Sequence, residues 1–440
     1  MIELTLAEAV TSRVKAIFNI PELEKRVTFT LLMIMVARVG IHIAVPGINT
    51  EAFKNFQQGN AIAQFLNLFS GGAVERASIF ALGIVPYINA SIVFQLLGVI
   101  FPKIDEMQKE GGKERDKITQ WTRYLTIVLA LGQSFGIAVM LANQGFVLED
   151  TSFKFIIRTV VLMTGGTAFL MWISERISIK GIGNGTSMLI FLNIVAGLPS
   201  VLTQAYSSLK GSGTGIILMF ISIIVFVVFI ALMVLVQLAE RRIPIQYAGK
   251  GSLGFGGGQS AVGRRTYLPL KINMSGVMPI IFASVLMAAP PFLVTLMKPG
   301  VWKNRLTTWF SQTGVLYLLL FAVLITVFSF FYTLTIAFDP DKVSEDLKQS
   351  GGTIPTVRAG AETADYLEKV VTRVTFGSAI FLSILGILPN IWFGYVLHIP
   401  VLLGGTSLLI LVGTAVELLL QIDSYLAVKQ MKGFISRKNK

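Results

Sequence analysis

Cysteine is absent from this chain of 440 residues, and charged residues make up only 14% of it. Without cysteine the chain has no disulfide, no thiolate nucleophile and no cysteine-ligated metal. A soluble protein of this length carries more charge to cover its surface. The low charge content therefore points to a membrane protein.

Residues that carry enzyme chemistry are also scarce. The two histidines, His42 and His398, fall near the external ends of apolar segments, with no nucleophile or metal ligand expected beside them, so we interpret both as solvated interface residues. No phosphate-binding G-x-x-x-x-G-K-[ST] occurs. Gly249-x-Gly251-x-x-Gly254 has a dinucleotide-binding spacing, but we expect neither the preceding strand nor the following helix. We predict no enzyme activity, no cofactor and no metal.

Long apolar runs are what the sequence has in abundance. Hydrophobic residues make up 53% of the chain, and runs of about 20 apolar residues, the length that crosses a hydrocarbon core, recur along it. Strands of a membrane barrel would alternate in polarity instead. The sequence predicts an all-α polytopic membrane protein with ten transmembrane helices. The expected spans are Val27–Val45, Ala77–Ile100, Trp121–Leu141, Phe153–Ile173, Ser187–Ala205, Gly215–Leu238, Ile272–Leu296, Val315–Phe338, Val371–Leu388 and Val401–Leu426.

Basic residues predict the orientation of these spans. The formal net charge is +13, and the positive residues concentrate in segments 103–123, 241–271 and 429–440, which lie on one side if ten spans are right. Cytoplasmic loops are the ones enriched in Lys and Arg, so we place both termini in the cytoplasm. Residues 1–26 would form a cytoplasmic segment whose part Thr5–Ile17 is an amphipathic helix on the membrane. The main cations of the opposite loops are Lys54, Lys210, Lys298, Lys303 and Arg305.

Two apolar motifs occur twice, in the same order. Gly83-Ile-Val-Pro-Tyr-Ile-Asn-Ala-Ser91 recurs as Gly276-Val-Met-Pro-Ile-Ile-Phe-Ala-Ser284, and Gly185-Thr-Ser recurs as Gly405-Thr-Ser. We interpret the chain as a duplication, which is a feature of membrane transport folds.

Because each half has five spans, an odd number, the second half crosses the membrane in the opposite orientation to the first. The predicted halves are residues 27–208 and 209–428, followed by a basic cytoplasmic tail at 429–440. Inverted repeats also occur in secondary transporters of small solutes, which remain the alternative function. A transporter needs ionisable groups at the membrane midplane. The candidates Arg38 and Glu417 fall on opposite sides of it, and each is better explained by a helix end or a polar neighbour.

Isoleucines occupy matching positions in the repeated motifs. Ile88 corresponds to Ile281, and Ile190 corresponds to Ile410. Ile84 lies one helical turn from Ile88, and Ile194 lies one helical turn from Ile190. Antiparallel copies bring these residues to a similar depth. Ordinary packing explains any single isoleucine, but the matched set predicts a constriction that excludes water and ions.

Two further features have both a structural and a functional interpretation. Residues Ile62–Phe69 are too short to span, so with the hinge Gly71-Gly72 they form either a re-entrant helix or a surface helix in an external loop. Pro86 and Pro279 should kink their spans. Gln95 and Asn273 are polar helix ends or a hydrogen-bonded seam between the second and seventh spans.

The chain resembles the SecY family over almost its whole length. The most specific matching segments are 76–88, Gly181-Ile-Gly-Asn-Gly185, Gly263-Arg-Arg265, Leu268-Pro-Leu-Lys-Ile-Asn273 and Ile354-Pro-Thr-Val-Arg358. The resemblance implies a passive channel that passes unfolded secretory polypeptides across the membrane and releases apolar segments sideways into lipid.

The resemblance also implies roles for individual residues. The pore ring would be Ile84, Ile88, Ile190, Ile194, Ile281 and Ile410. The plug, at about 62–72, would include Ile62, Phe65, Leu66, Asn67, Phe69, Ser70, Gly71 and Gly72. The lateral gate would include Pro86, Ser91, Gln95, Asn273 and Pro279. Cytosolic partners would dock at Arg241, Arg242, Arg264, Arg265 and Arg358, although Arg241 and Arg242 are also accounted for by the positive-inside rule.

Partners and location follow from the same resemblance. The membrane subunits SecE and SecG, the motor SecA, the ribosome, signal sequences, nascent polypeptide clients and membrane lipid would be the partners. The protein would lie in the bacterial inner membrane, with several spans and with both termini in the cytoplasm.

Overall fold

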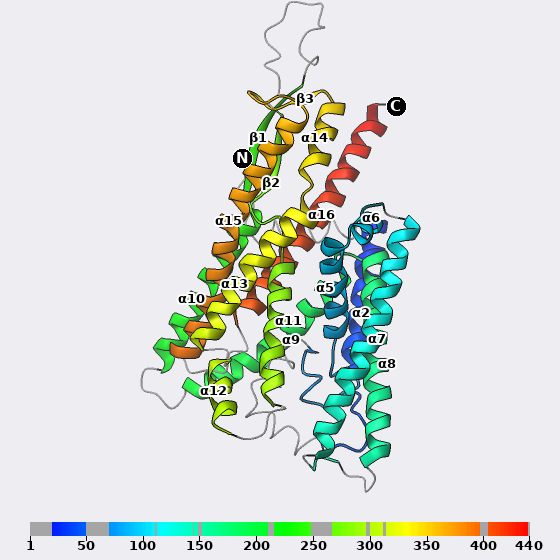
Figure 1. Ribbon diagram of the computed structural model, residues 1–440, viewed down its shortest axis with the longest axis vertical. Helices are drawn as coiled ribbons and strands as arrows, with labels where there is room; N and C mark the ends of the chain where they lie inside the picture. Colours follow the sequence, from blue (N-terminus) through cyan, green and yellow to red (C-terminus); the bar gives the residue numbers. More distant parts are fainter. Residues whose placement is uncertain are drawn as a thin grey trace, which may run out of the picture. The chain divides into compact units, whose positions relative to one another are not determined.

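The computed structural model of the protein is mostly helical (Figure 1). Its described residues group into two compact units. Unit 1 contains Met1–Ser207 and Thr414–Lys440, and unit 2 contains Ser208–Gly413. The structure describes residues 20–49, 70–110, 112–143, 145–147, 152–209, 215–247, 266–295, 300–310, 314–396 and 404–438. The expected amphipathic helix Thr5–Ile17, most of the expected plug and His398 lie outside these ranges.

In unit 1 the third, fourth and fifth predicted spans lie within longer helices, whereas the helix of the second span begins eight residues later than predicted. Charges that would be unfavourable in lipid lie toward the ends of these helices, where they reach water, which explains why the helices extend beyond the apolar runs. The helices are α2 (Pro21–Gly40), α5 (Val85–Ile100), α6 (Pro102–Glu110), α7 (Gly112–Asn143), α8 (Ser152–Lys180) and α9 (Gly185–Leu209).

Unit 2 adds short elements between its membrane helices. The helix α10 (Gly215–Leu238) has the predicted bounds. The last helix, α16 (Gly405–Lys438), begins in unit 2 and belongs to unit 1 from Thr414 onward. The remaining elements are β1 (Glu240–Tyr247), β2 (Thr266–Lys271), α11 (Met278–Thr295), α12 (Val301–Trp309), α13 (Val315–Tyr332), η1 (Thr333–Ala337), α14 (Pro340–Gln349), β3 (Gly352–Thr353), α15 (Ala361–Ile391) and η2 (Trp392–Val396).

Helix length and composition support a polytopic membrane protein. Among the described residues six helices are long and apolar enough to cross a membrane, or up to seven if the bent pair α5 and α6 counts as one span. The apolar part of α9, Gly185–Pro199, and that of α11, Met278–Met287, are shorter. Many apolar side chains face outward, such as Phe220 and Leu319, which are 66% and 60% exposed. An apolar surface of this kind matches lipid rather than water.

The helices of the two units pack in the same scheme. In unit 1, α5 packs on α7, α7 on α8, and α2 on α8. In unit 2, α11 packs on α13, α13 on α15, and α10 on α15. In each unit the second membrane helix therefore packs on the third, the third on the fourth, and the first on the fourth. This shared packing supports duplication independently of the repeated sequence motifs.

The second predicted span is wrong in its first part. Residues 71–84 form turns rather than a helix, and α5 begins only at Val85. Ala77 has a positive φ of 48°, which interrupts a helix, and its carbonyl accepts a hydrogen bond from the Val45 amide at 2.8 Å. The hydroxyl of Ser78 donates to the Gly40 carbonyl at 3.1 Å. The segment's backbone polar groups thus find partners inside the protein.

A small sheet interrupts the expected all-helical pattern. Strand β1 pairs antiparallel with both β2 and β3, so the strand order is β2-β1-β3. Ile243 and Ile245 of β1 alternate with exposed residues, and Ile243 packs with Leu270 and with α15 through Leu367. Contrary to our expectation, a strand does precede the Gly249-x-Gly251-x-x-Gly254 segment. The next described element is β2 rather than the helix that a dinucleotide site requires.

Candidate functional site in the repeated motifs

The two copies of the first motif begin their helices in the same way. Gly83 has φ of +59° and Gly276 has φ of +62°, a backbone conformation that glycine adopts without strain. Each helix begins two residues later, α5 at Val85 and α11 at Met278. Pro86 and Pro279 are therefore second residues of helices. The predicted kinks are wrong, because a proline in the first turn removes no helical hydrogen bond.

The first-turn hydrogen bonds of these helices also correspond. The amides of Tyr87 and Ile88 both donate to the Ile84 carbonyl at 3.1 Å. The amides of Ile280 and Ile281 both donate to the Val277 carbonyl at 3.2 Å. The motif thus sets the same helix start in each unit, and it places Ile88 and Ile281 at the same position of their helices.

The glycines of the second motif are required by close backbone contact. A Cβ at Gly185 would lie 2.6 Å from the carbonyl carbon of Ser174 in α8. A Cβ at Gly405 would lie 2.5 Å from the carbonyl carbon of Gly386 in α15. Only glycine lets the starts of α9 and α16 approach the preceding membrane helix this closely.

A side chain one turn further along the preceding helix satisfies each of these glycine amides. The Gly185 amide donates to Ser178 Oγ at 2.8 Å, and the Gly405 amide donates to Asn390 Oδ1 at 3.1 Å. Ser178 follows Ser174 by four residues, and Asn390 follows Gly386 by four. The first N–H groups of a helix need such partners, so the two units solve the same problem with different side chains.

All six isoleucines of the expected pore ring are buried. Ile84, Ile88, Ile190 and Ile194 belong to unit 1 and are 2%, 4%, 0% and 1% exposed. Ile281 and Ile410 belong to unit 2 and are 2% and 0% exposed. Burial alone fits ordinary packing as well as a constriction, so the assignment of these residues to a pore stays a prediction.

The polar residues of the expected lateral gate bond within their own segments. Gln95 Nε2 donates to Ser91 Oγ at 3.0 Å, one turn back in α5. Asn273 Nδ2 donates to the Gly276 carbonyl at 3.0 Å, which stabilises the turn before α11. Gln95 Oε1 is buried and has no hydrogen-bond partner within the described part of the chain. These bonds lie within single segments, and the assignment of Gln95 and Asn273 to a seam between two spans stays a prediction.

Only the last residues of the expected plug are described. Arg38 Nη1 donates to the Gly71 carbonyl at 3.0 Å, and Gly71 has φ of +65°. A Cβ at Gly71 would lie 2.5 Å from Asn193 Oδ1 and 2.7 Å from Arg38 Nη1. The expectation that Arg38 has a polar neighbour near its helix end is confirmed. The contact joins α2 and α9 to the turn at the end of the expected plug.

The docking arginines that are described face outward. Arg241, Arg242 and Arg358 are exposed, and the Arg242 guanidinium lies 4.8 Å from the centre of the Tyr267 ring across the strand pair. The Arg358 carbonyl accepts a hydrogen bond from the Thr363 hydroxyl at 2.7 Å, which ties the loop to the start of α15. Arg264 and Arg265 lie outside the described residues.

An ion pair within the membrane helices of unit 1 was not predicted. Arg123 in α7 donates from Nε and Nη2 to the two carboxylate oxygens of Glu175 in α8, at 2.7 and 2.8 Å. Both residues are ionisable groups near the ends of apolar segments, a signal that the sequence did contain. This two-point contact fixes α7 against α8, the helix whose end positions Gly185.

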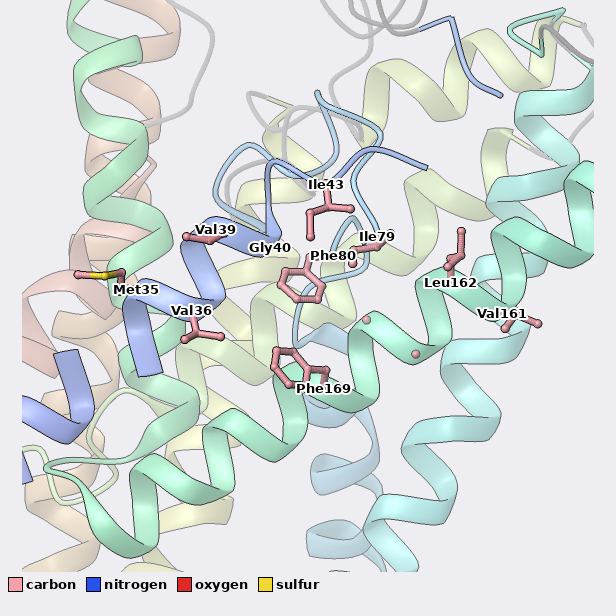
Figure 2. Close-up of a pocket in the computed structure, with 12 residues that line it drawn as sticks. Met35, Val36, Val39, Gly40, Ile43, Ile79, Phe80, Val161, Leu162 and Phe169 are labelled. Carbon is pink, nitrogen blue, oxygen red and sulfur yellow. The ribbon is translucent and has the colours of Figure 1, made fainter. Parts of the chain in front are cut away.

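An apolar groove of about 550 Å³ lies between α2 and α8 (Figure 2). Phe80 and Phe169 stack within it, with ring centroids 6.1 Å apart. Gly166 of α8 has no room for a side chain because the Ile79 carbonyl approaches it. The groove thus marks where the non-helical entry to α5 rests on α8. Its lining is apolar and open to the outside, as on surfaces that contact a membrane.

Comparison with known proteins agrees with this architecture. The SecY family model matches residues 78–419. The protein translocase subunit SecY of Aquifex aeolicus is 40% identical over 435 residues, which cover 96% of this chain and 99% of that protein. A structure described as a protein-conducting channel covers 91% of each chain with a TM-score of 0.64 and 18% identity. Sec61 in the canine ribosome-channel complex from the endoplasmic reticulum covers 91% of each chain, with a TM-score of 0.59 and 18% identity.

The duplicated helical scheme and the likeness to solved structures define a polytopic membrane protein with a channel fold. Its fold is the SecY channel fold, which has ten transmembrane helices. The chain belongs to the SecY family of protein translocase subunits.

Proposed function

We propose that this channel passes unfolded secretory polypeptides through a constriction lined by Ile84, Ile88, Ile190, Ile194, Ile281 and Ile410. Membership of the SecY family makes the chain a protein-conducting channel, not an enzyme. The observation that carries the proposal is the repeated geometry of the helix starts, which gives Ile88 and Ile281 the same position in α5 and α11. A constriction of branched apolar side chains excludes water and ions when no polypeptide occupies it.

Sideways release follows from partition energetics. We propose that α5 and α11 form a lateral gate represented by Pro86, Ser91, Gln95, Asn273 and Pro279. Each Leu or Ile of a client favours lipid by about 0.3–0.6 kcal/mol at the centre of a membrane helix, whereas a charged residue costs about 2.5–3.5 kcal/mol. A segment of apolar residues would therefore leave into lipid, and a polar segment would continue through the channel.

The turn at the end of the expected plug is attached to α2 through the Gly71 carbonyl. We propose that residues 62–72 cover the external face of the constriction. The hydrogen bond between Arg38 and the Gly71 carbonyl supports this proposal, since it holds the base of the segment against α2. Opening would require this charge-assisted bond to break or to move with the segment.

Cytosolic partners would bind the exposed arginines of β1 and of the loop before α15. We propose that Arg241, Arg242 and Arg358, with Arg264 and Arg265, contact the ribosome or the motor SecA, and that SecE and SecG complete the membrane complex. A related fold, Sec61, was solved in a ribosome-channel complex, which supports the ribosome as a partner. Guanidinium groups suit RNA phosphate and protein carboxylates, because they donate two parallel hydrogen bonds.

The chain is a multi-pass protein of the SecY type found in bacterial membranes. We place it in the inner membrane with both termini in the cytoplasm, because the basic segments then face the cytoplasm. The two halves, 27–208 and 209–428, would be inverted relative to each other, with the short segment 1–26 and the basic tail 429–440 in the cytoplasm.

Ion conductance tests the constriction. We expect the double substitution Ile88→Ser and Ile281→Ser to make resting channels leak ions in planar bilayers, because polar side chains keep water in the constriction. The matched control is Ile157→Ser with Ile384→Ser, one exposed isoleucine from each unit, 50% and 48% exposed. Equal conductance in the two double variants would contradict the assignment of the ring.

A further inference from the structure

The short helix α12 carries an unusual outward face. It contains two of the five tryptophans of the chain, Trp302 and Trp309, which are 66% and 48% exposed. Arg305 is also exposed, and its guanidinium lies 6.0 Å from the centre of the Trp302 ring. At 100° per residue these three side chains fall within one stripe of the helix. We call Trp302, Arg305 and Trp309 the α12 face.

The position of α12 puts this face at a membrane boundary. The helix contacts both α11 and α13, the membrane helices that it connects. It lies at the end of unit 2 opposite to the β1-β2-β3 sheet (Figure 1). Tryptophan is enriched at membrane–water interfaces, where its ring lies in the apolar region and its N–H reaches polar groups. Two exposed tryptophans at the end of two membrane helices therefore point to the headgroup layer.

The charge around α12 selects the type of headgroup. The connection between α11 and α13 carries Lys298, Lys303 and Arg305 in the sequence, and no acidic residue occurs from Arg241 to Phe338. In the proposed orientation this connection is external, where the positive-inside rule disfavours cations. An anionic surface accounts for these cations, because each Lys or Arg near anionic lipid gains about 1 kcal/mol, a factor of about five.

The other short connecting helix of unit 2 provides an internal contrast. Helix α14 buries Leu347 and exposes charges of both signs, among them Asp341, Glu345 and Lys348. It has no tryptophan, and its first turn is capped by Asp339. Such a face suits water or a protein partner. The difference shows that a short helix between membrane helices of this chain does not have to expose aromatic residues.

We propose that the α12 face binds the headgroups of anionic phospholipids in the outer leaflet and anchors the external end of α11. The leaflet assignment rests on the proposed orientation of the channel, whereas the lipid contact does not. In this arrangement the tryptophan rings enter the interface, and the Arg305 guanidinium binds a lipid phosphate through two hydrogen bonds.

Site-directed fluorescence tests the lipid contact in the full-length channel. Because the chain has no cysteine, Val301→Cys, at a position that is 70% exposed, gives a single attachment point for an environment-sensitive dye. Lys348→Cys on α14 is the matched control. Both proteins are reconstituted in vesicles that mix phosphatidylcholine with phosphatidylglycerol, and either lipid can carry bromine as a quencher at a shallow position.

We expect blue-shifted emission at residue 301, with quenching by brominated phosphatidylglycerol that corresponds to a binding constant about fivefold above that of phosphatidylcholine. Arg305→Gln should bring this ratio toward one, and Arg305→Lys should retain it. Trp302→Ala with Trp309→Ala should shift the emission toward that of a probe in water. The dye at residue 348 should emit as in water in every vesicle.

Three outcomes would overturn the proposal. The first is aqueous emission at residue 301, and the second is equal quenching by the two lipids. The third is shielded emission without quenching by either lipid, which would indicate a protein partner on the α12 face. A membrane-impermeant thiol reagent separates these outcomes from an error in topology. Reaction of residue 301 only from the cytoplasmic side would overturn the proposed orientation and the outer-leaflet assignment, and the quenching would still decide the lipid contact.

Discussion

Replacing Gly185 or Gly405 with alanine should destabilise the channel, because both helix starts touch the backbone of the preceding helix. A Cβ would lie 2.6 Å from the Ser174 carbonyl carbon or 2.5 Å from the Gly386 carbonyl carbon, and real Cβ contacts essentially never fall below 3.0 Å. The carbonyl oxygens of Ser174 and Gly386 lie closer still, so the two helices must separate by about one ångström. Overpacking of this kind costs about 1–3 kcal/mol, and the helix propensity of alanine offsets at most about 1 kcal/mol.

The matched control is Gly377→Ala in α15. No heavy atom lies within 4 Å of the Cβ position at Gly377, so this substitution should leave stability unchanged or raise it by up to about 1 kcal/mol. The measurement is the free energy of unfolding of each purified variant in mixed micelles, obtained from the loss of helical signal on titration with SDS. If Gly185→Ala and Gly405→Ala unfold at the same SDS fraction as Gly377→Ala, close backbone contact is not what requires glycine in the second motif.

Two further substitutions test contacts outside the repeated motifs. Arg38→Met removes the 3.0 Å bond to the Gly71 carbonyl, which should loosen this turn. Exchange of the hydrogen-bonded Val74 and Ser78 amides should then rise by about one to two orders of magnitude, as expected for a bond to a charged group worth about 1.5–3 kcal/mol. Unchanged exchange, relative to Lys154→Met on the exposed start of α8, would contradict this role. Arg358→Glu should weaken ribosome binding and lower the salt dependence of that binding. Lys348→Glu makes the same change of charge nearby and should leave binding unchanged. An equal loss of ribosome affinity in both variants would mean that only net charge matters.

The sequence predicted helices well where composition alone decides them. The bounds of α10 match the expected span because its apolar run ends at Gln237 and Leu238. The same reasoning failed at Ala77–Ile84, where an apolar composition suits a helix and a packed turn equally. Here long-range bonds to the turn after α2 decide the conformation. Strand β1 could have been found in part, since Ile243 and Ile245 are spaced two residues apart between Arg242 and Gln246, which is a strand signal, although Pro244 between them weakens it.

The repeated motifs identified related segments of the chain but not where the helices begin. Their glycines lie at or just before the starts of α5, α11, α9 and α16, whereas two of the predicted spans began at Ala77 and Ile272, with Pro86 and Pro279 inside them. The partners Ser178 and Asn390 were not predicted. They lie in the preceding helices, outside both repeated motifs, and they are different amino acids. The same holds for Arg123 and Glu175, whose pairing depends on the packing of α7 on α8.

The duplication therefore preserves backbone geometry more strictly than side-chain identity, and this bears on the composition of the proposed ring. The motif position of Ile84 is occupied in the second half by Val277, which is 3% exposed, and that of Ile194 is occupied by Thr414, which is 2% exposed. Both counterparts are as deeply buried as the isoleucines they match. Thr414 Oγ1 has no hydrogen-bond partner within the described residues, which is unfavourable in a dry apolar contact. If the ring were set by symmetry alone, Val277 and Thr414 would belong to it. The proposed ring instead takes four isoleucines from the first half and two from the second, so it rests on chemistry as well as on position.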